Sequence, residues 1–142
     1  MVSRYREVDT VNIIRVNQMV TANFNFEEYI CPCCNRIRLI PLFWEHVEKM
    51  ERLRQRLGFA LIFNSAYRCP EHNRTVGGAL DSWHMKIATD TRPEWAGIDD
   101  NEYLRRLQAI GDEAPGVGFR GIGTYSTFRH LDCRPVPARW NG

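Results

Sequence analysis

The chain has 142 residues, 25% of them charged, and its formal net charge is only +2. This length suits one hydrophobic core and is short for two, so we expect a single domain. The weak net charge and the scattered basic residues give no footprint of nucleic-acid binding, so we expect no nucleic-acid partner. No stretch approaches membrane-spanning length, so we expect no membrane insertion.

The N-terminal residues lack the apolar run of a secretory signal, so we expect synthesis in the cytoplasm. Five cysteines without such a signal argue against a disulfide scaffold and favour free thiols or metal ligation. The residues up to about Asn25 show no strong periodicity. We therefore assign 1–25 to an N-terminal arm and 26–142 to one folded domain.

The first half of the domain predicts a helix followed by a strand. Apolar side chains recur at helical spacing from Pro41 to Leu57, and Gly58 is placed to end that helix in a left-handed cap. The apolar run Phe59 to Phe63 predicts a buried strand. Pro70 then begins a short helix that Gly77 ends.

The second half predicts another helix and a strand pair. The helix runs from Asn101 to Ile110, with Asp100 as N-cap, Gly111 as stop, and Leu104 and Leu107 facing inward with Ile110. The tail from 116 to 133 alternates glycines with apolar residues and predicts two antiparallel strands. The fold class is therefore α+β, a small antiparallel sheet packed by helices.

Two segments combine histidines with carboxylates in a pattern typical of a catalytic zinc site. The first runs from Ser82 to Asp90 and the second from Phe128 to Asp132. Two imidazoles and one carboxylate leave a fourth metal position open for water, which favours hydrolysis over a closed structural site.

His130 and Asp132 lie two residues apart on a predicted strand, so their side chains point to the same face. If His130 binds a metal, Asp132 lies within reach of the imidazole's second nitrogen or of a metal-bound water. Asp132 is then either an orienting partner of the ligand or a general base. The sequence leaves both roles open, and we favour the general base slightly.

An ordered set of motifs extends from about Phe26 to the C-terminus. These motifs are Cys31-Pro32-Cys33-Cys34-Asn35, Leu57-Gly58, Asn64-Ser65-Ala66-Tyr67-Arg68-Cys69-Pro70-Glu71-His72-Asn73-Arg74, Val76-Gly77-Gly78-Ala79, Ser82-x-His84, Gly121-Ile122-Gly123-x-Tyr125, Phe128-x-His130-x-Asp132 and Arg139-Trp140. In the identity and order of these motifs, the chain resembles the zinc D-alanyl-D-alanine peptidases of bacteria and phages. Those enzymes share a metal core with the vancomycin-resistance dipeptidases and the Hedgehog signalling domain.

The resemblance implies a zinc peptidase acting on peptidoglycan stem peptides, as a carboxypeptidase or an endopeptidase. It implies that His84, Asp90 and His130 hold Zn2+, and that Arg68 binds or polarises the substrate with Ser82 as a supporting hydroxyl. A guanidinium suits that role, because its fixed fork of donors matches a carboxylate or a developing oxyanion. A substrate in the cell wall implies action there after release or delivery.

The chain departs from the resembled pattern at two places. Some relatives carry a general-base carboxylate where this chain has Thr127, which leaves Asp132 as our candidate. The resembled pattern is Ser-x-His-x-x-Gly-x-Ala-x-Asp. Compared with it, this chain has one residue fewer between His84 and Asp90 and lacks the glycine that would follow Lys86. The alternative function is therefore a non-catalytic wall-binding or phage structural module that keeps the fold with a degraded metal site.

The cysteines support a second metal hypothesis. Cys31-x-x-Cys34 and Cys69-x-x-His72 have the pairwise spacing of structural zinc ligands. A close cysteine pair or plain buried thiols are the alternatives, and Cys133 is expected to be a core residue.

Overall fold

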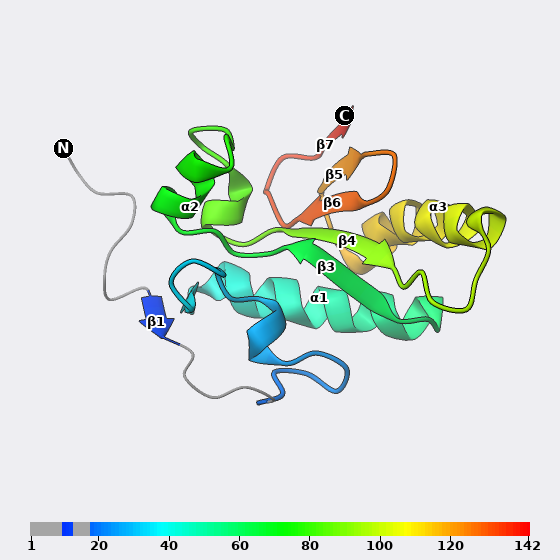
Figure 1. Ribbon diagram of the computed structural model, residues 1–142, viewed down its shortest axis with the longest axis horizontal. Coiled ribbons are helices and arrows are strands. Elements are labelled where there is room, and N and C mark those ends of the chain that lie inside the picture. Colours follow the sequence, from blue (N-terminus) through cyan, green and yellow to red (C-terminus); the bar gives the residue numbers. More distant parts are fainter. Residues whose placement is uncertain (1–9, 13–17) are drawn as a thin grey trace.

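The computed structural model describes residues 10–12 and 18–142 and has an α+β fold, which confirms the predicted class (Figure 1). The helices and strands follow one another as β1 (Thr10–Asn12), the 3-10 helix η2 (Phe26–Glu28), β2 (Arg36–Arg38), α1 (Pro41–Leu57), β3 (Leu61–Ser65), α2 (Pro70–Thr75), the 3-10 helix η3 (Trp83–Met85), β4 (Thr89–Pro93), α3 (Asp100–Val117), β5 (Gly121–Thr124), β6 (Arg129–Asp132) and β7 (Ala138–Asn141).

The main sheet has the strand order β3-β4-β6-β5-β7. The predicted antiparallel pair of the tail is confirmed as β5 and β6, and β3, β4 and β6 are also antiparallel neighbours. The sequence did not predict β7, which joins the edge of the sheet parallel to β5. Figure 1 shows α1 along one side of β3 and β4 and α2 on the other.

Side chains of strand β4 point alternately into the core and toward the candidate site. Thr89 and Thr91 are fully buried, and Thr89 Oγ1 lies 3.1 Å from Nε2 of His46 on α1. Asp90 lies between them in sequence and therefore projects from the opposite face. One strand thus contributes to the helix-covered core with one face and to the site with the other.

The predicted helix over Pro41 to Leu57 is confirmed, and Gly58 ends it with φ of 74°. Its buried side chains, which include Phe43, Val47, Met50 and Leu53, form one stripe that packs into the core. The strand that follows begins two residues later than predicted, at Leu61. Phe59 and Ala60 instead connect the left-handed cap at Gly58 to β3.

The predicted end of the second long helix is wrong. Helix α3 continues through Gly111 to Val117, and Gly118 ends it with φ of 107°. Gly111 is buried, and a Cβ at this position would lie 3.2 Å from Nε of Arg129. Packing of the helix against β6 therefore outweighs the low helix propensity of glycine.

The predicted cap and inward face of α3 also need correction. The N-cap is Asp99, not Asp100, and its carboxylate accepts a hydrogen bond from the Glu102 backbone N–H at 2.7 Å. Leu107 is buried as predicted, but Leu104 is 56% exposed. The buried stripe passes through Tyr103 instead, because neighbouring helical residues project about 100° apart.

Part of the predicted N-terminal arm, residues 1–9 and 13–17, lies outside the described residues. Strand β1 pairs with β2 in a separate two-stranded sheet. Phe24 is buried against the ring of Phe63, and the Asn23 backbone N–H donates to Glu51 of α1 at 2.8 Å. The division of the chain at residue 25 stays a prediction.

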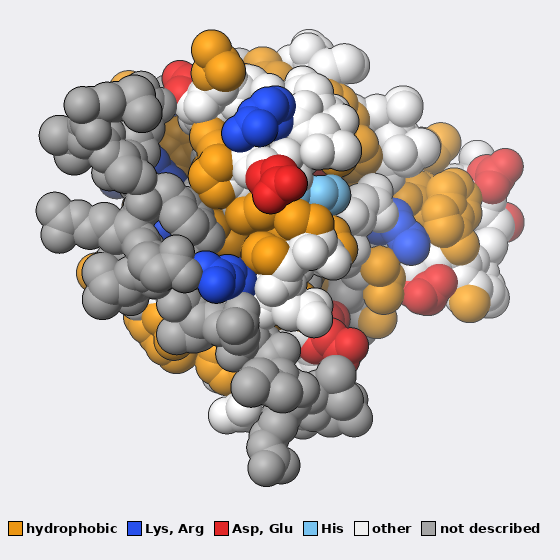
Figure 2. Space-filling model, turned by 60° about the vertical axis from the view of Figure 1, so that its left-hand side comes forward, with side chains coloured by type: hydrophobic (Ala, Val, Ile, Leu, Met, Phe, Trp, Pro, Cys, Tyr) orange, Lys and Arg blue, Asp and Glu red, His pale blue; other side chains and the backbone are white. Residues whose placement is uncertain are grey.

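The surface carries mixed charge. Among the described side chains, Figure 2 shows acidic and basic groups interspersed on one face of the molecule. No helix in the described part of the chain is both long and apolar enough to cross a bilayer.

Leu107 and Leu104 provide a matched test of the corrected helix face. We expect Leu107→Ala to lower the free energy of unfolding by about 2 to 5 kcal/mol, because it leaves a cavity in the core. Leu104→Ala on the exposed side should change it by less than about 0.5 kcal/mol. Equilibrium urea denaturation of both variants measures the difference, and equal losses would contradict the assigned face.

Candidate active site

His84, Asp90 and His130 come together although they lie on three separate elements. His84 lies on η3, Asp90 on β4 and His130 on β6, where it pairs directly with Asp90. Oδ1 of Asp90 lies 3.2 Å from Nε2 of His84 and 3.2 Å from Nδ1 of His130. One possible ligand atom from each of the three residues lies within 4.8 Å of the other two.

The shortened segment between His84 and Asp90 still brings the two side chains together. Ser82 caps η3 by accepting a hydrogen bond from the His84 backbone N–H at 3.2 Å. Ile87 and Ala88 are then buried, and β4 begins at the next residue. The turn of η3 and residues 86–88 thus connect the two ligand positions in place of the longer segment of the resembled pattern.

A hydrogen-bond partner on the far side orients each imidazole. Nδ1 of His84 lies 2.7 Å from the Ala66 carbonyl oxygen, and Nε2 of His130 lies 2.8 Å from Oδ2 of Asp132. Both partners can only accept, so these two nitrogens carry the hydrogens. In its neutral form each imidazole therefore directs its unprotonated nitrogen toward Asp90, the arrangement found around metal-ligating histidines.

The donor set fits a zinc ion. Two imidazole lone pairs and a carboxylate oxygen face one another, and such a group is satisfied either by extra protons or by a shared cation. Burial raises the pKa of Asp90, but the hydrogen bonds that the two histidines donate when these nitrogens carry the extra protons outweigh it and hold that pKa well below its usual range. Two nitrogens and an anionic oxygen are the ligand types of catalytic zinc.

Asp132 lies behind His130 and is fully buried. Nε of Arg134 donates to its Oδ1 at 2.8 Å, and Nη2 donates to Oδ2 at 2.6 Å. Burial raises the pKa of Asp132, but the bonds with Arg134 and His130 outweigh it and hold the pKa well below its usual range. Of the two roles left open by the sequence, this geometry favours orientation of His130 over proton acceptance.

A hollow opens over the three candidate ligands, and Asp132 does not line it. It is lined by Arg68, Ala79, Asp81, Ser82, Trp83, His84, Asp90, Tyr125, Phe128, His130, Arg134 and Trp140. The predicted substrate-binding residues Arg68 and Ser82 therefore share one concave surface with the candidate ligands. Such a surface with converging polar groups is typical of a substrate site.

Arg68 is held at the edge of this hollow by its neighbours. Its backbone N–H donates to the His84 carbonyl oxygen at 2.8 Å, and its Nη2 donates to Oγ of Ser82 at 3.4 Å. Its Nε is buried, yet it has no hydrogen-bond partner among the described residues. Arg68 as a whole is half-buried and lines the hollow, so its guanidinium is suited to bind a carbonyl or carboxylate oxygen of a ligand.

Sequence reasoning assigned no role to Arg134, Trp83 or Trp140. The guanidinium of Arg134 lies over both indole rings, 5.6 Å from Trp83 and 4.8 Å from Trp140. The Trp140 ring also occupies the space of a missing side chain, since a Cβ on Gly123 would lie 2.7 Å from it. The period-two spacing from Asp132 could have indicated Arg134, whereas its contacts with Trp83 and Trp140 depend on where η3 and β7 lie in the fold.

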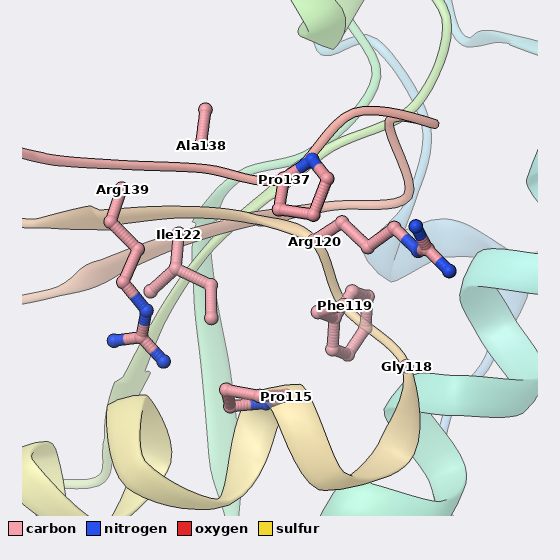
Figure 3. A pocket seen from close by; sticks show the side chains of 8 residues that line it. All are labelled: Pro115, Gly118, Phe119, Arg120, Ile122, Pro137, Ala138 and Arg139. Carbon is pink, nitrogen blue, oxygen red and sulfur yellow. The ribbon is translucent and has the colours of Figure 1, made fainter.

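Figure 3 shows a second hollow, between the end of α3 and the strands β5 and β7. Its lining residues are Pro115, Gly118, Phe119, Arg120, Ile122, Pro137, Ala138 and Arg139. These residues include no histidine, cysteine or carboxylate. This hollow is therefore no candidate for metal binding or acid–base chemistry.

Comparison with protein families matches residues 16–132 to the family described as Peptidase M15. The matched range contains His84, Asp90 and His130 together with Arg68. No curated protein sequence matched the chain.

Asp132→Asn tests the orienting role. We expect zinc affinity to fall by roughly ten- to a hundredfold, because the amide replaces the charged acceptor that orients His130. Titration of zinc against a chromophoric chelator measures the change. Asp81→Asn is the matched control, because Asp81 lies outside the set of three ligands. Unchanged affinity in Asp132→Asn would contradict the role.

Proposed function

The chain belongs to the M15 peptidase family, and we propose that it is a zinc-dependent peptidase that cleaves an amide next to a D-amino acid in peptidoglycan stem peptides. The observation that carries this proposal is the convergence of His84, Asp90 and His130 beside Arg68 in one hollow. A zinc ion held by these three residues supplies Lewis-acid activation of a water and of the amide carbonyl.

Arg68 is the residue that we assign to substrate binding. Its place in the lining of the hollow and its contact with Ser82 support a guanidinium held ready for an oxygen of the peptide. A terminal carboxylate or the scissile carbonyl both suit this fork of donors. We assign Ser82 the supporting role of fixing the Arg68 side chain.

We assign proton acceptance to Asp81 instead of Asp132. Asp132 is buried, and both its oxygens accept hydrogen bonds from Arg134. Among the described residues that line the hollow, the carboxylates are Asp81 and Asp90. With Asp90 in the ligand set, Asp81 is the carboxylate left to accept a proton in that hollow.

The proposed substrate implies action at the cell wall after release or delivery of the protein. A peptidoglycan peptide is then the partner, and neither nucleic acid nor membrane insertion has a part. The alternative is a wall-binding or phage structural module without activity. Its support is the shortened segment between His84 and Asp90, and the convergence of the three candidate ligands weighs against it.

The decisive experiment incubates the zinc-loaded protein with intact peptidoglycan and with defined stem peptides. Mass spectrometry then identifies the products, and new amino groups are counted. Release of terminal D-alanine indicates a carboxypeptidase, and cleavage of cross-linked peptides indicates an endopeptidase. Binding of peptidoglycan without any cleavage by the zinc-loaded protein would contradict the proposal and favour the inactive module.

Arg68→Ala should lower turnover by about 10²- to 10³-fold, because it removes the donors aimed at the substrate oxygen. Zinc content should stay unchanged, since Arg68 lies outside the ligand set. Arg74→Ala is the matched control, because Arg74 is exposed on α2. Steady-state kinetics and elemental analysis of both variants distinguish substrate binding from a structural role, and loss of zinc in Arg68→Ala would contradict the assignment.

Asp81→Asn should lower turnover by roughly 10²- to 10⁴-fold, the usual contribution of a general base, while zinc stays bound. The amide keeps the size of the side chain and removes only its ability to accept a proton. Full turnover in the variant would rule out Asp81 as the proton acceptor.

A further inference from the structure

Four of the five cysteines gather at a second place in the fold, apart from the candidate active site. The sulfur atoms of Cys31, Cys33, Cys34 and Cys69 all lie within 4.8 Å of one another. The first three lie on the turn before β2, and Cys69 is the N-cap of α2. Segments more than thirty residues apart in sequence thus supply one compact group of thiols.

The spacing of the sulfurs matches a tetrahedral metal site. Sγ of Cys33 lies 3.6 Å from Sγ of Cys31 and 3.2 Å from Sγ of Cys69. Four sulfurs at about 2.3 Å from a zinc ion lie about 3.8 Å from one another. A disulfide needs its sulfurs about 2.05 Å apart, and all four cysteines are free thiols.

The backbone around the cysteines is folded as a metal-binding turn requires. Asn35 adopts φ of 54°, and its N–H donates to the Cys31 carbonyl oxygen at 2.9 Å. This tight turn brings the three cysteines of one short segment to the same side. On the other segment, the His72 backbone N–H donates to Sγ of Cys69 at 3.4 Å, a contact that stabilises a thiolate.

The fourth member of the group differs from the one that spacing suggested. The sequence paired Cys31 and Cys34 with Cys69 and His72, but Cys33 completes the set of converging atoms and His72 is outside it. His72 contributes its backbone N–H to Cys69 instead. The prediction of His72 as a ligand is therefore corrected.

We propose that Cys31, Cys33, Cys34 and Cys69 bind a structural zinc ion. Four thiolates fill a tetrahedral coordination sphere and leave no position for water, so this site stabilises the fold and does not hydrolyse. It ties the turn before β2 to the start of α2. Arg68 directly precedes Cys69, so the same ion fixes the backbone from which Arg68 enters the hollow.

Metal content of variants tests this site independently of any peptidase activity. The protein, purified under reducing conditions with zinc, should hold about two zinc ions per chain by elemental analysis. Cys33→Ser should hold about one, because it removes a ligand from an exposed position and perturbs the core least. His72→Ala and Cys133→Ser should each keep about two, because these residues lie outside both ligand sets.

The double variant His84→Ala with His130→Ala separates the two sites. It should keep about one zinc per chain. After exchange for cobalt it should show the near-ultraviolet charge-transfer absorption of thiolate ligands, which Cys33→Ser should lose. Absence of that absorption in the double variant, or full zinc content in Cys33→Ser, would overturn the proposal. Failure of the peptidase assay leaves these readouts unchanged, so the two proposals fail separately.

Discussion

The pairing of β4 with β6 is the constraint on which the site depends. In this register Asp90 lies directly opposite His130, so their side chains share one face of the sheet. A slip of one residue would turn Asp90 toward α1 and bring a threonine to the site. The register is held by the opposite face, where the buried Thr89 and Leu131 pair with each other in the core.

Strand β6 also carries a polar group into the interior, where Asp132 pairs with Gly121 of β5. Asp132 is fully buried, and it is tolerated because Arg134 and His130 donate to its oxygens. The neighbouring strand β5 leaves room for this network because it has glycines at two positions. A Cβ on Gly121 would overlap the Asp132 carboxylate, and one on Gly123 would overlap the Trp140 ring. The geometry of the candidate site and the packing of the core are therefore linked through β5.

The N-terminal segment and the active-site segment are also linked. The Tyr67 backbone N–H donates to the Tyr29 carbonyl oxygen at 3.2 Å, and Nη1 of Arg38 donates to the Met85 carbonyl oxygen at 3.0 Å. The proposed cysteine site joins the same two regions. Because Arg68 lies between Tyr67 and Cys69, several independent contacts hold it in position, which supports its proposed role as a pre-organised substrate donor.

The sequence by itself determined the α+β class, the helix from Pro41 to Leu57 and the candidate ligands, because local periodicity and motif order are written along the chain. It placed His130 and Asp132 on one face because strand geometry is local. Only the tertiary structure decided where α3 ends, that β7 joins the sheet, and which side of His130 Asp132 occupies. It also replaced His72 by Cys33 in the thiol group. Convergence in space depends on turn conformation and on pairing between distant segments, and spacing along the chain encodes neither.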